Sequence, residues 1–379
     1  MRRVAVLFSL TGCSSIFGLH APARGTVVDA PASDGADASD GPTADGNMCV
    51  GRGVLTVCFD ALPTMATQLP TSIATTDNAQ CSTGVHWASS SQPTACFIAG
   101  TTDTQTGTTV VTGGRPLVLV ALDSLQVTGL IDASSHVGVT ALGPGADPGA
   151  CPAFAAAPQA NPNGGGGGAG GSFVSAGGAG GMGDNGGTLG GRPAPATAAS
   201  PVLRGGCAGQ LGVMGGGSGA STPGHGGGAI YLLAGSALSV QAGRIAANGA
   251  GATAPNNRYG GSGGGAGGMI VLDAPTITMA GAFLSANGGG GAAGTDGGVG
   301  EAGSDPDPLH PTVAALGGAG SKGGAGGAGA TVTAAAPDGG STGGGNLHSG
   351  GGGGGGIGVI YAPGALDGAT VSPSVTTLP

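Results

Sequence analysis

Cysteine is the residue type whose number and spacing suggest covalent chemistry in this chain. Six cysteines follow Cys13, and they are Cys49, Cys58, Cys81, Cys96, Cys151 and Cys207. An even number of thiols is typical of a disulfide framework in an exported protein. The sequence leaves the connectivity open, and neighbour pairing is the simplest assignment: Cys49 with Cys58, Cys81 with Cys96, and Cys151 with Cys207. The close ligand spacing of zinc sites is missing, so we predict no metal site.

Carboxylates and histidines, which carry acid and base catalysis, are dispersed along the chain. Glycosidases and metal-dependent enzymes need carboxylates that cluster. Glu301 is the only glutamate, and Asp123, Asp132 and Asp273 fall singly in different repeats of the sequence. The histidines His136, His225, His310 and His348 lie in polar or glycine-rich connections, and His86 stands beside Trp87. We therefore predict a protein that is not an enzyme, with no catalytic residue and no cofactor.

The amino terminus has the layout of a secretory signal. Arg2 and Arg3 precede an apolar run over 4–10, which is too short to span a bilayer. The run ends in Leu-Thr-Gly-Cys at 10–13, which resembles the lipobox of bacterial lipoproteins. The resemblance implies that 1–12 is a signal peptide, that Cys13 carries acyl chains such as palmitate, and that the membrane is a partner through this anchor. Ser14 stands where lipoproteins retained in the inner membrane often have Asp, which favours the outer membrane.

Two segments separate this terminus from the repeats. In 13–47, Asp residues alternate with Ala, Gly, Ser and Pro without an apolar period, a composition typical of an extended, solvated linker. In 48–114, short β-rich runs are separated by Pro, Gly and Asn clusters, so we predict a small β module stapled by two disulfides that caps the rest of the chain.

Composition excludes several partners. Charged residues make up 8% of the chain and the formal charge is −9, so a nucleic acid would find no basic patch. Aromatic residues make up 3%, which leaves almost no stacking platform for bases or sugars. Gly 90 and Pro 25 suggest low complexity, whereas the 39% hydrophobic content argues against general disorder.

An internal repeat predicts the fold of 115–379. Residues 229–249 align without gaps on 268–288, an offset of 39 that places Leu233 on Leu272 and keeps apolar residues in register. Looser copies begin at 117 and 357. Each copy holds two short β-runs and is too short to bury its own apolar face, so stacked copies would share an interior column. We predict an all-β fold: a parallel β-helix, or solenoid-like body, with Asn-Gly pairs at tight corners and glycine-rich loops.

The glycine runs, such as 164–171, 260–268 and 350–356, allow two interpretations. They are either flexible loops or threefold polyglycine helices that pack closely because no side chain intervenes.

Together these features predict a lipid-anchored cell-envelope protein of the outer membrane, exposed on the cell surface. The organisation resembles glycine-rich lipoproteins of large-genome environmental bacteria, and it implies a structural, adhesive or surface-display role. An envelope or extracellular protein or polysaccharide surface would be its partner. The alternatives are a β-solenoid polysaccharide lyase or hydrolase and a periplasm-facing scaffold.

Overall fold

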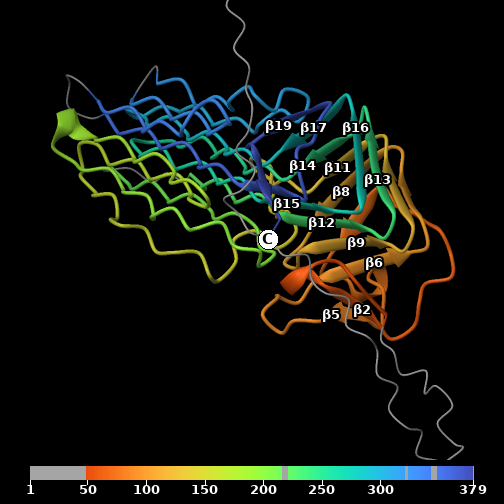
Figure 1. The fold of residues 1–379 in the computed structure, drawn as a ribbon. Coiled ribbons are helices and arrows are strands. Elements are labelled where there is room, and N and C mark those ends of the chain that lie inside the picture. The colour runs from red at the N-terminus through yellow and green to blue at the C-terminus, as the bar shows by residue number, and fades with distance from the viewer. Residues whose placement is uncertain (1–47, 216–220, 321–322, 343–347, 379) are drawn as a thin grey trace, which may run out of the picture. The chain divides into compact units, whose positions relative to one another are not determined.

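The computed structural model describes residues 48–378, apart from 216–220, 321–322 and 343–347. The predicted signal peptide 1–12, the lipid-bearing Cys13 and the linker 13–47 lie outside the described residues. Residues Asn47–Pro379 belong to one unit. Figure 1 shows strands gathered at one end of this unit, while extended glycine-rich segments run away from them side by side.

Three short strands form an antiparallel sheet, sheet A, beside the larger sheets. They are β1 (Met48–Val50), β2 (Val57–Phe59) and β5 (Val85–Trp87), with β2 in the centre. Cys49 lies directly opposite Cys58 in this sheet, and the two form a disulfide. The helical content of the described residues is three short 3-10 segments, η1 (Gly53–Leu55), η2 (Asn78–Gln80) and η3 (Asp184–Gly186).

The other strands form three parallel sheets. Sheet B has the order β16 (Thr276–Ala280), β13 (Ala237–Gln241), β10 (Ser124–Val127), β7 (Asp103–Gln105), β3 (Thr67–Gln68). Sheet C has the order β19 (Ala369–Ser372), β17 (Ala282–Ser285), β14 (Arg244–Ala246), β11 (Leu130–Asp132), β8 (Thr108–Thr112), β4 (Ser72–Ala74). Sheet D has the order β20 (Val375–Thr377), β18 (Val359–Ala362), β15 (Met269–Asp273), β12 (Ala229–Ala234), β9 (Leu117–Ala121), β6 (Cys96–Gly100).

The predicted all-β fold with a closed parallel β-helix or solenoid-like body is wrong. The described strands form separate parallel sheets of five, six and six strands plus one small antiparallel sheet, which is a stack of sheets. Strands from 48–114 and from 115–379 share these sheets, as the pairing of β6 with β9 shows. The described residues between β11 and β12, and between β17 and β18, contain no named strand. The physical reason is that glycine-rich chain satisfies its hydrogen bonds outside the sheets, as described below.

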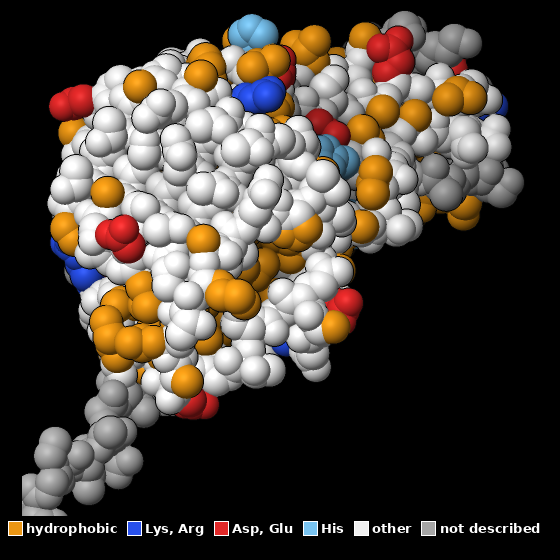
Figure 2. Space-filling view, turned by 90° about the vertical axis from the view of Figure 1, so that its right-hand side faces the viewer, with side chains coloured by type: hydrophobic (Ala, Val, Ile, Leu, Met, Phe, Trp, Pro, Cys, Tyr) orange, Lys and Arg blue, Asp and Glu red, His pale blue; other side chains and the backbone are white. Residues whose placement is uncertain are grey.

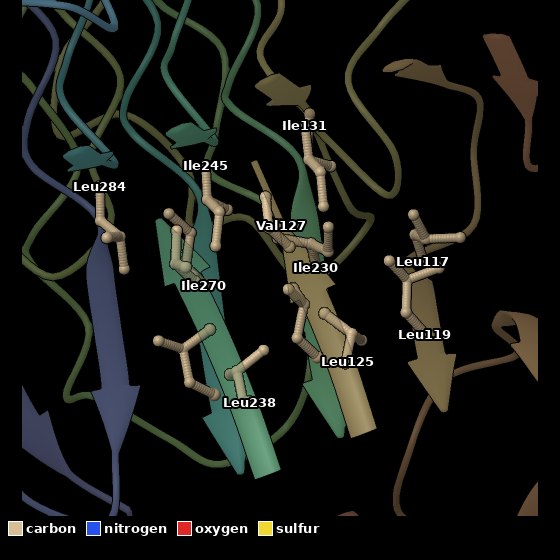
Figure 3. Close-up of a cluster of buried hydrophobic side chains, with 14 of the residues drawn as sticks. Leu117, Leu119, Leu125, Val127, Ile131, Ile230, Leu238, Ile245, Ile270 and Leu284 are labelled. Atoms are coloured by element: carbon tan, nitrogen blue, oxygen red, sulfur yellow. The ribbon is translucent and has the colours of Figure 1, made fainter. Parts of the chain in front are cut away.

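The four inner strands of sheet D, β9, β12, β15 and β18, are buried on both faces, which explains why they are almost continuously apolar. Leu119, Leu232 and Leu272 face a core that sheets B and C share. Figure 3 shows side chains of all three sheets pointing toward one another in this core. The intervening residues of the same strands, such as Val120 and Leu233, face a second core, which includes residues of sheet A and of the glycine-rich segments.

The predicted register is correct in sheet B and wrong in sheet D. Leu238 pairs with Ile277, an offset of 39, but Leu232 rather than Leu233 pairs with Leu272. Five residues separate Leu232 from Leu238, whereas four separate their partners Leu272 and Ile277, so the chain is one residue shorter on its way from sheet D to sheet B in the later repeat. A slip of one residue exchanges the two faces of a strand. Because both faces of sheet D are apolar, the hydrophobic pattern could not reveal the slip.

The Asn-Gly pairs of the two aligned repeats, 248–249 and 287–288, do not form the predicted corners with positive φ. Asn248 and Asn287 are buried and lie directly after sheet C. The side-chain oxygen of Asn248 accepts from the Asn287 N–H at 2.9 Å, and the Asn248 N–H donates to Ser134 Oγ at 3.0 Å. The amide side chains therefore form a polar ladder that joins successive repeats where the chain leaves the sheets.

The glycine runs pack as threefold chains, and we call the described parts of 164–228, 247–268 and 286–358 the glycine slab. In 350–358 every third backbone N–H donates to the same neighbouring segment. Residues 350, 353 and 356 donate to segment 165–171, and residues 351 and 354 donate to segment 337–340. Residues 352, 355 and 358 donate to segment 286–292. These N···O distances are 2.8 to 3.1 Å. Three residues per turn is the geometry of a polyproline II-type helix. The flexible-loop interpretation is therefore wrong for this run.

Glycine is required in the slab because the chains lie too close for side chains. A Cβ added to Gly352, Gly353 or Gly354 would lie closer than 3.0 Å to a backbone oxygen of another segment. These oxygens belong to three further segments around 262, 178 and 328. Segment 350–358 is thus enclosed on all sides by backbone.

Candidate functional site: a histidine and carboxylate cleft

A cleft of about 280 Å³ lies where the glycine slab meets the sheets. Two histidines line it together with small and aliphatic residues: His136, Gly138, Val139, Thr140, Thr222, Pro223, His225, Ala250, Gly251 and Thr253. His136 follows β11 by four residues, and His225 precedes β12 by four residues. The parallel neighbours β11 and β14, and the return of the chain to β12, therefore place these distant residues together.

His136 bridges two carboxylates. Its Nε2 lies 3.2 Å from an oxygen of Asp132, and its Nδ1 lies 3.3 Å from an oxygen of Asp305. The hydrogen bonds to Asp132 and Asp305 raise the pKa of His136 to about 10. Burial alone would raise the pKa of Asp132, but its hydrogen bonds with His136 and Ser134 lower it. At neutral pH His136 is therefore an imidazolium that donates to Asp132 and Asp305.

Asp305 also fastens the backbone around the cleft. Its oxygens accept from the Val137 N–H at 3.0 and 3.1 Å and from the Gly251 N–H at 2.8 Å. Asp305 belongs to the slab, whereas Asp132 belongs to sheet C, so the Asp132, His136, Asp305 cluster clamps one to the other.

His225 forms a second clamp with Asp147. The Nδ1 atom lies 2.7 Å from one carboxylate oxygen, and the other oxygen accepts from the Gly226 N–H at 2.9 Å. The hydrogen bond to Asp147 raises the pKa of His225. Both clamps join segments that leave and re-enter the sheets, so their geometry supports a structural role.

The cleft offers little nucleophilic chemistry. The Thr222 and Thr253 hydroxyls lie 2.9 Å apart and bond to each other, and the Ser221 hydroxyl donates to the Thr253 carbonyl oxygen. Among the residues that the structure describes, no group of three or more His, Cys, Asp or Glu side chains is arranged to hold a metal ion.

A separate buried carboxylate joins sheet A to sheet D. Asp273 is 3% exposed and lies 3.0 Å from the Arg52 guanidinium. The Tyr231 hydroxyl donates to it at 3.2 Å. Burial raises the pKa of Asp273, and the Arg52 charge opposes that shift. The network fastens the start of the described chain to β15.

Asp103 interrupts the interior column of sheet B. It occupies the position that Leu125 and Leu238 fill in the next strands. Its side chain is buried beside Thr67, its neighbour in β3. Burial raises the pKa of Asp103 to about 7, and Thr67 opposes that shift. A buried carboxyl group next to an apolar column costs stability when it is charged.

The structure brings together some of the residues noted in the sequence and leaves others apart. Asp132, His136 and His225 meet at the cleft, whereas Asp273 lies with Arg52 and Tyr231. The remaining residues lie apart from one another. Asp123 is in the turn before β10, His310 lies 2.7 Å from Asp307, and His86 lies 3.6 Å from Asp60. The Glu301 carboxylate accepts from the Ala319 N–H, and the His348 carbonyl oxygen accepts from the Asp184 N–H.

Sequence reasoning missed Asp147 and Asp305, which complete the clamps. Asp147 lies 78 residues from His225, and Asp305 lies 169 residues from His136. The one local signal was the spacing of Asp132 and His136 at the end of a β-run. No repeat links the other partners, because Asp147 and Asp305 lie outside the aligned copies 229–249 and 268–288.

The disulfides join the cysteine pairs that neighbour pairing predicted. The second and third bonds are Cys81–Cys96 and Cys151–Cys207, with Cα atoms 5.2 and 5.8 Å apart. Cys151–Cys207 spans 56 residues and ties together the first excursion of the chain into the slab.

Charged side chains are sparse on the face drawn in Figure 2, where acidic and basic groups appear singly among neutral atoms. Among the described residues we find no helix with the length and hydropathy needed to cross a bilayer. No protein-family model, curated protein or solved structure matches this chain.

Proposed function

We propose that this chain is a lipid-anchored protein of the cell envelope with a structural, adhesive or surface-display role, and that it is not an enzyme. The observation that carries the proposal is the glycine slab, in which backbone hydrogen bonds fix chain that has few side chains. Glycine loses more conformational freedom on folding than any other residue. A sequence that orders so many glycines loses much conformational entropy on folding. The product is a rigid, closely packed layer of backbone, which suits a structural or display role better than catalysis.

The surface of the slab supports presentation to a partner. Large apolar side chains project from its turns and edges, including Met182, Leu189, Leu211, Met214 and Val299, which are 38 to 73% exposed. Figure 1 places η3, which follows Met182, at the end farthest from the sheets. Contiguous exposed apolar side chains are typical of interaction sites, and Met182 and Leu189 line the same groove.

Cys13 is the proposed anchor, and its replacement separates the anchor from the body. In the Cys13→Ser variant the protein should disappear from the membrane fraction, because stable attachment requires acyl chains. Protease treatment of intact cells should remove the body of the unaltered protein.

Three results would contradict parts of this proposal. If the Cys13→Ser variant still sediments with membranes, Cys13 is not the anchor. If the body is protected from protease in intact cells, the protein is a scaffold that faces the periplasm. Cleavage of plant or bacterial polysaccharides by the purified protein would show that it is an enzyme.

A further inference from the structure

A buried carboxyl group lies under the edge strand that ends sheet B. Asp103 of β7 is 1% exposed, and its register partners Leu125 and Leu238 face the shared core. Paired residues of neighbouring strands point to the same face of a sheet, so Asp103 faces that core as well. On its other side β7 pairs with β3, which has two residues and is the last strand of the sheet. Thr67 of β3 lies directly opposite Asp103.

The surroundings of this carboxyl group are close and uncharged. A Cβ added to Gly100 would lie 2.5 Å from Asp103 Oδ1 and 2.6 Å from Thr67 Oγ1, so the three residues converge. The neighbouring strands place only neutral side chains on this side, namely Thr67 of β3, Leu125 of β10, and Leu119 and Ala121 of β9.

No opposite charge compensates Asp103. Among the described residues, no Lys, Arg or His forms an ion pair with it. Asp123, which is exposed in the turn before β10, has the same sign of charge as an ionised Asp103. A carboxylate removed from solvent without a cation is strongly disfavoured, and burial accordingly raises the pKa of Asp103 to about 7 while Thr67 opposes the shift.

The segment that closes over Asp103, 65–69, has little structure of its own. The Thr67 N–H donates to Thr102 O at 2.8 Å, the Leu69 N–H donates to Thr104 O at 3.0 Å, and Met65 O accepts from the Thr101 N–H at 2.9 Å. Leu69 is 9% exposed and packs in the shared core, whereas Met65 is 77% exposed. Short elements with few buried apolar contacts are the ones that open locally while the rest of a protein stays folded.

We propose that the charge state of Asp103 controls whether segment 65–69 is closed over the end of the sheets. With Asp103 protonated, β3 stays paired with β7. When Asp103 gives its proton to water, the carboxylate becomes hydrated only if the segment opens, and opening exposes Leu69 and Leu125 beside Met65. The end of the sheets thus presents an apolar surface that depends on pH. This inference goes beyond the proposed function and depends on neither the anchor nor the display role.

The direction of the pH dependence follows from the raised pKa. The closed form holds a proton that the open form releases, because an aspartate in water has a pKa of about 3.9. The equilibrium constant for opening should therefore rise with pH between about 4 and about 7 and level off above that range. Between pH 5 and pH 8 the rise should be about 100-fold.

Amide hydrogen exchange of the full chain carrying Cys13→Ser tests the proposal. After correction for the intrinsic exchange rate at each pH, protection of the Thr67 and Leu69 N–H groups should fall about 100-fold from pH 5 to pH 8. Protection of β12 should not change. Asp103→Asn, which is neutral at both pH values, should abolish the fall, and Asp123→Asn is the matched control that should keep it.

A second variant keeps the test independent of how well Asn fits. Asp103→Leu places here the residue that sheet B has at 125 and 238, and it should also abolish the fall.

Three outcomes would overturn the inference. These are equal protection of 67 and 69 at pH 5 and pH 8 in the chain with Asp103, a fall that persists in Asp103→Asn and Asp103→Leu, and a fall of the same size in β12, which would mean global unfolding. None of these outcomes alters membrane fractionation or the protease result on intact cells, so failure here is distinguishable from failure of the proposed function.

Discussion

Replacing Gly353 by alanine should prevent the glycine slab from folding. The Gly353 N–H donates to Gly168 O at 2.9 Å, and a Cβ on this residue would collide with Gly178 O. The colliding atom belongs to backbone that is itself hydrogen-bonded, because the Gly178 N–H donates to Gly354 O. No rotation of a side chain can relieve the collision, so whole segments must separate.

The size of this effect follows from ordinary packing energies. Overpacking costs about 1–3 kcal/mol, and each displaced hydrogen bond adds about 1 kcal/mol. The sum is a large part of the roughly 5–15 kcal/mol that stabilises a typical protein. Urea unfolding followed by circular dichroism should show a lost or strongly lowered transition for Gly353→Ala.

Two other glycines supply matched controls. An added Cβ at Gly149 or Gly364 would meet no atom within 4 Å, and neither residue has positive φ. Alanine at these positions should leave stability unchanged or raise it by up to about 1 kcal/mol, since it restricts the unfolded chain. Equal behaviour of Gly353→Ala and Gly149→Ala would mean that the slab is not closely packed.

Leu232→Asp should unfold the sheets. Leu232 is fully buried and lies between Leu119 and Leu272 in neighbouring strands of sheet D. Aspartate here would place a carboxylate without partners in the shared core, at a cost of several kcal/mol. Circular dichroism should show that the Leu232→Asp variant has lost its β signal and its cooperative thermal transition.

Thr278→Asp is the matched control in sheet B. Thr278 lies on the exposed side of β16, next to Ser239, so the new carboxylate remains in water. Its cost should stay below about 1 kcal/mol. If Leu232→Asp folds as well as Thr278→Asp does, the parallel sheets do not enclose a core.

Several features of the fold could be predicted from sequence because local pattern determines them. The apolar β-runs around Leu119, Leu232 and Ile270 became neighbouring parallel strands, as the repeat indicated. Alternation at Leu238 and Val240 gave the correct register in sheet B, since only one face of that sheet is buried.

Other features depend on tertiary structure that leaves no local trace. A sheet buried on both faces hides its register, which is why Leu233 was placed with Leu272. The clamps depend on Asp147 and Asp305, which lie 78 and 169 residues from their histidines in the sequence. Asp103 stands at a position where the column of the other strands predicts leucine, and no local rule identifies such an exception.

The central claim is that the glycine runs are ordered, hydrogen-bonded chain, and amide hydrogen exchange of 350–358 tests it most directly. The N–H groups of 350–356 and 358 donate to backbone oxygens on three sides, and the Ile357 N–H donates to Ser175 Oγ. Their exchange should therefore be slowed as strongly as that of β12, through the shared unfolding of slab and sheets. The claim would be contradicted if 350–358 exchanged at the rate of unstructured chain while β12 remained protected. The glycine runs would then be flexible loops.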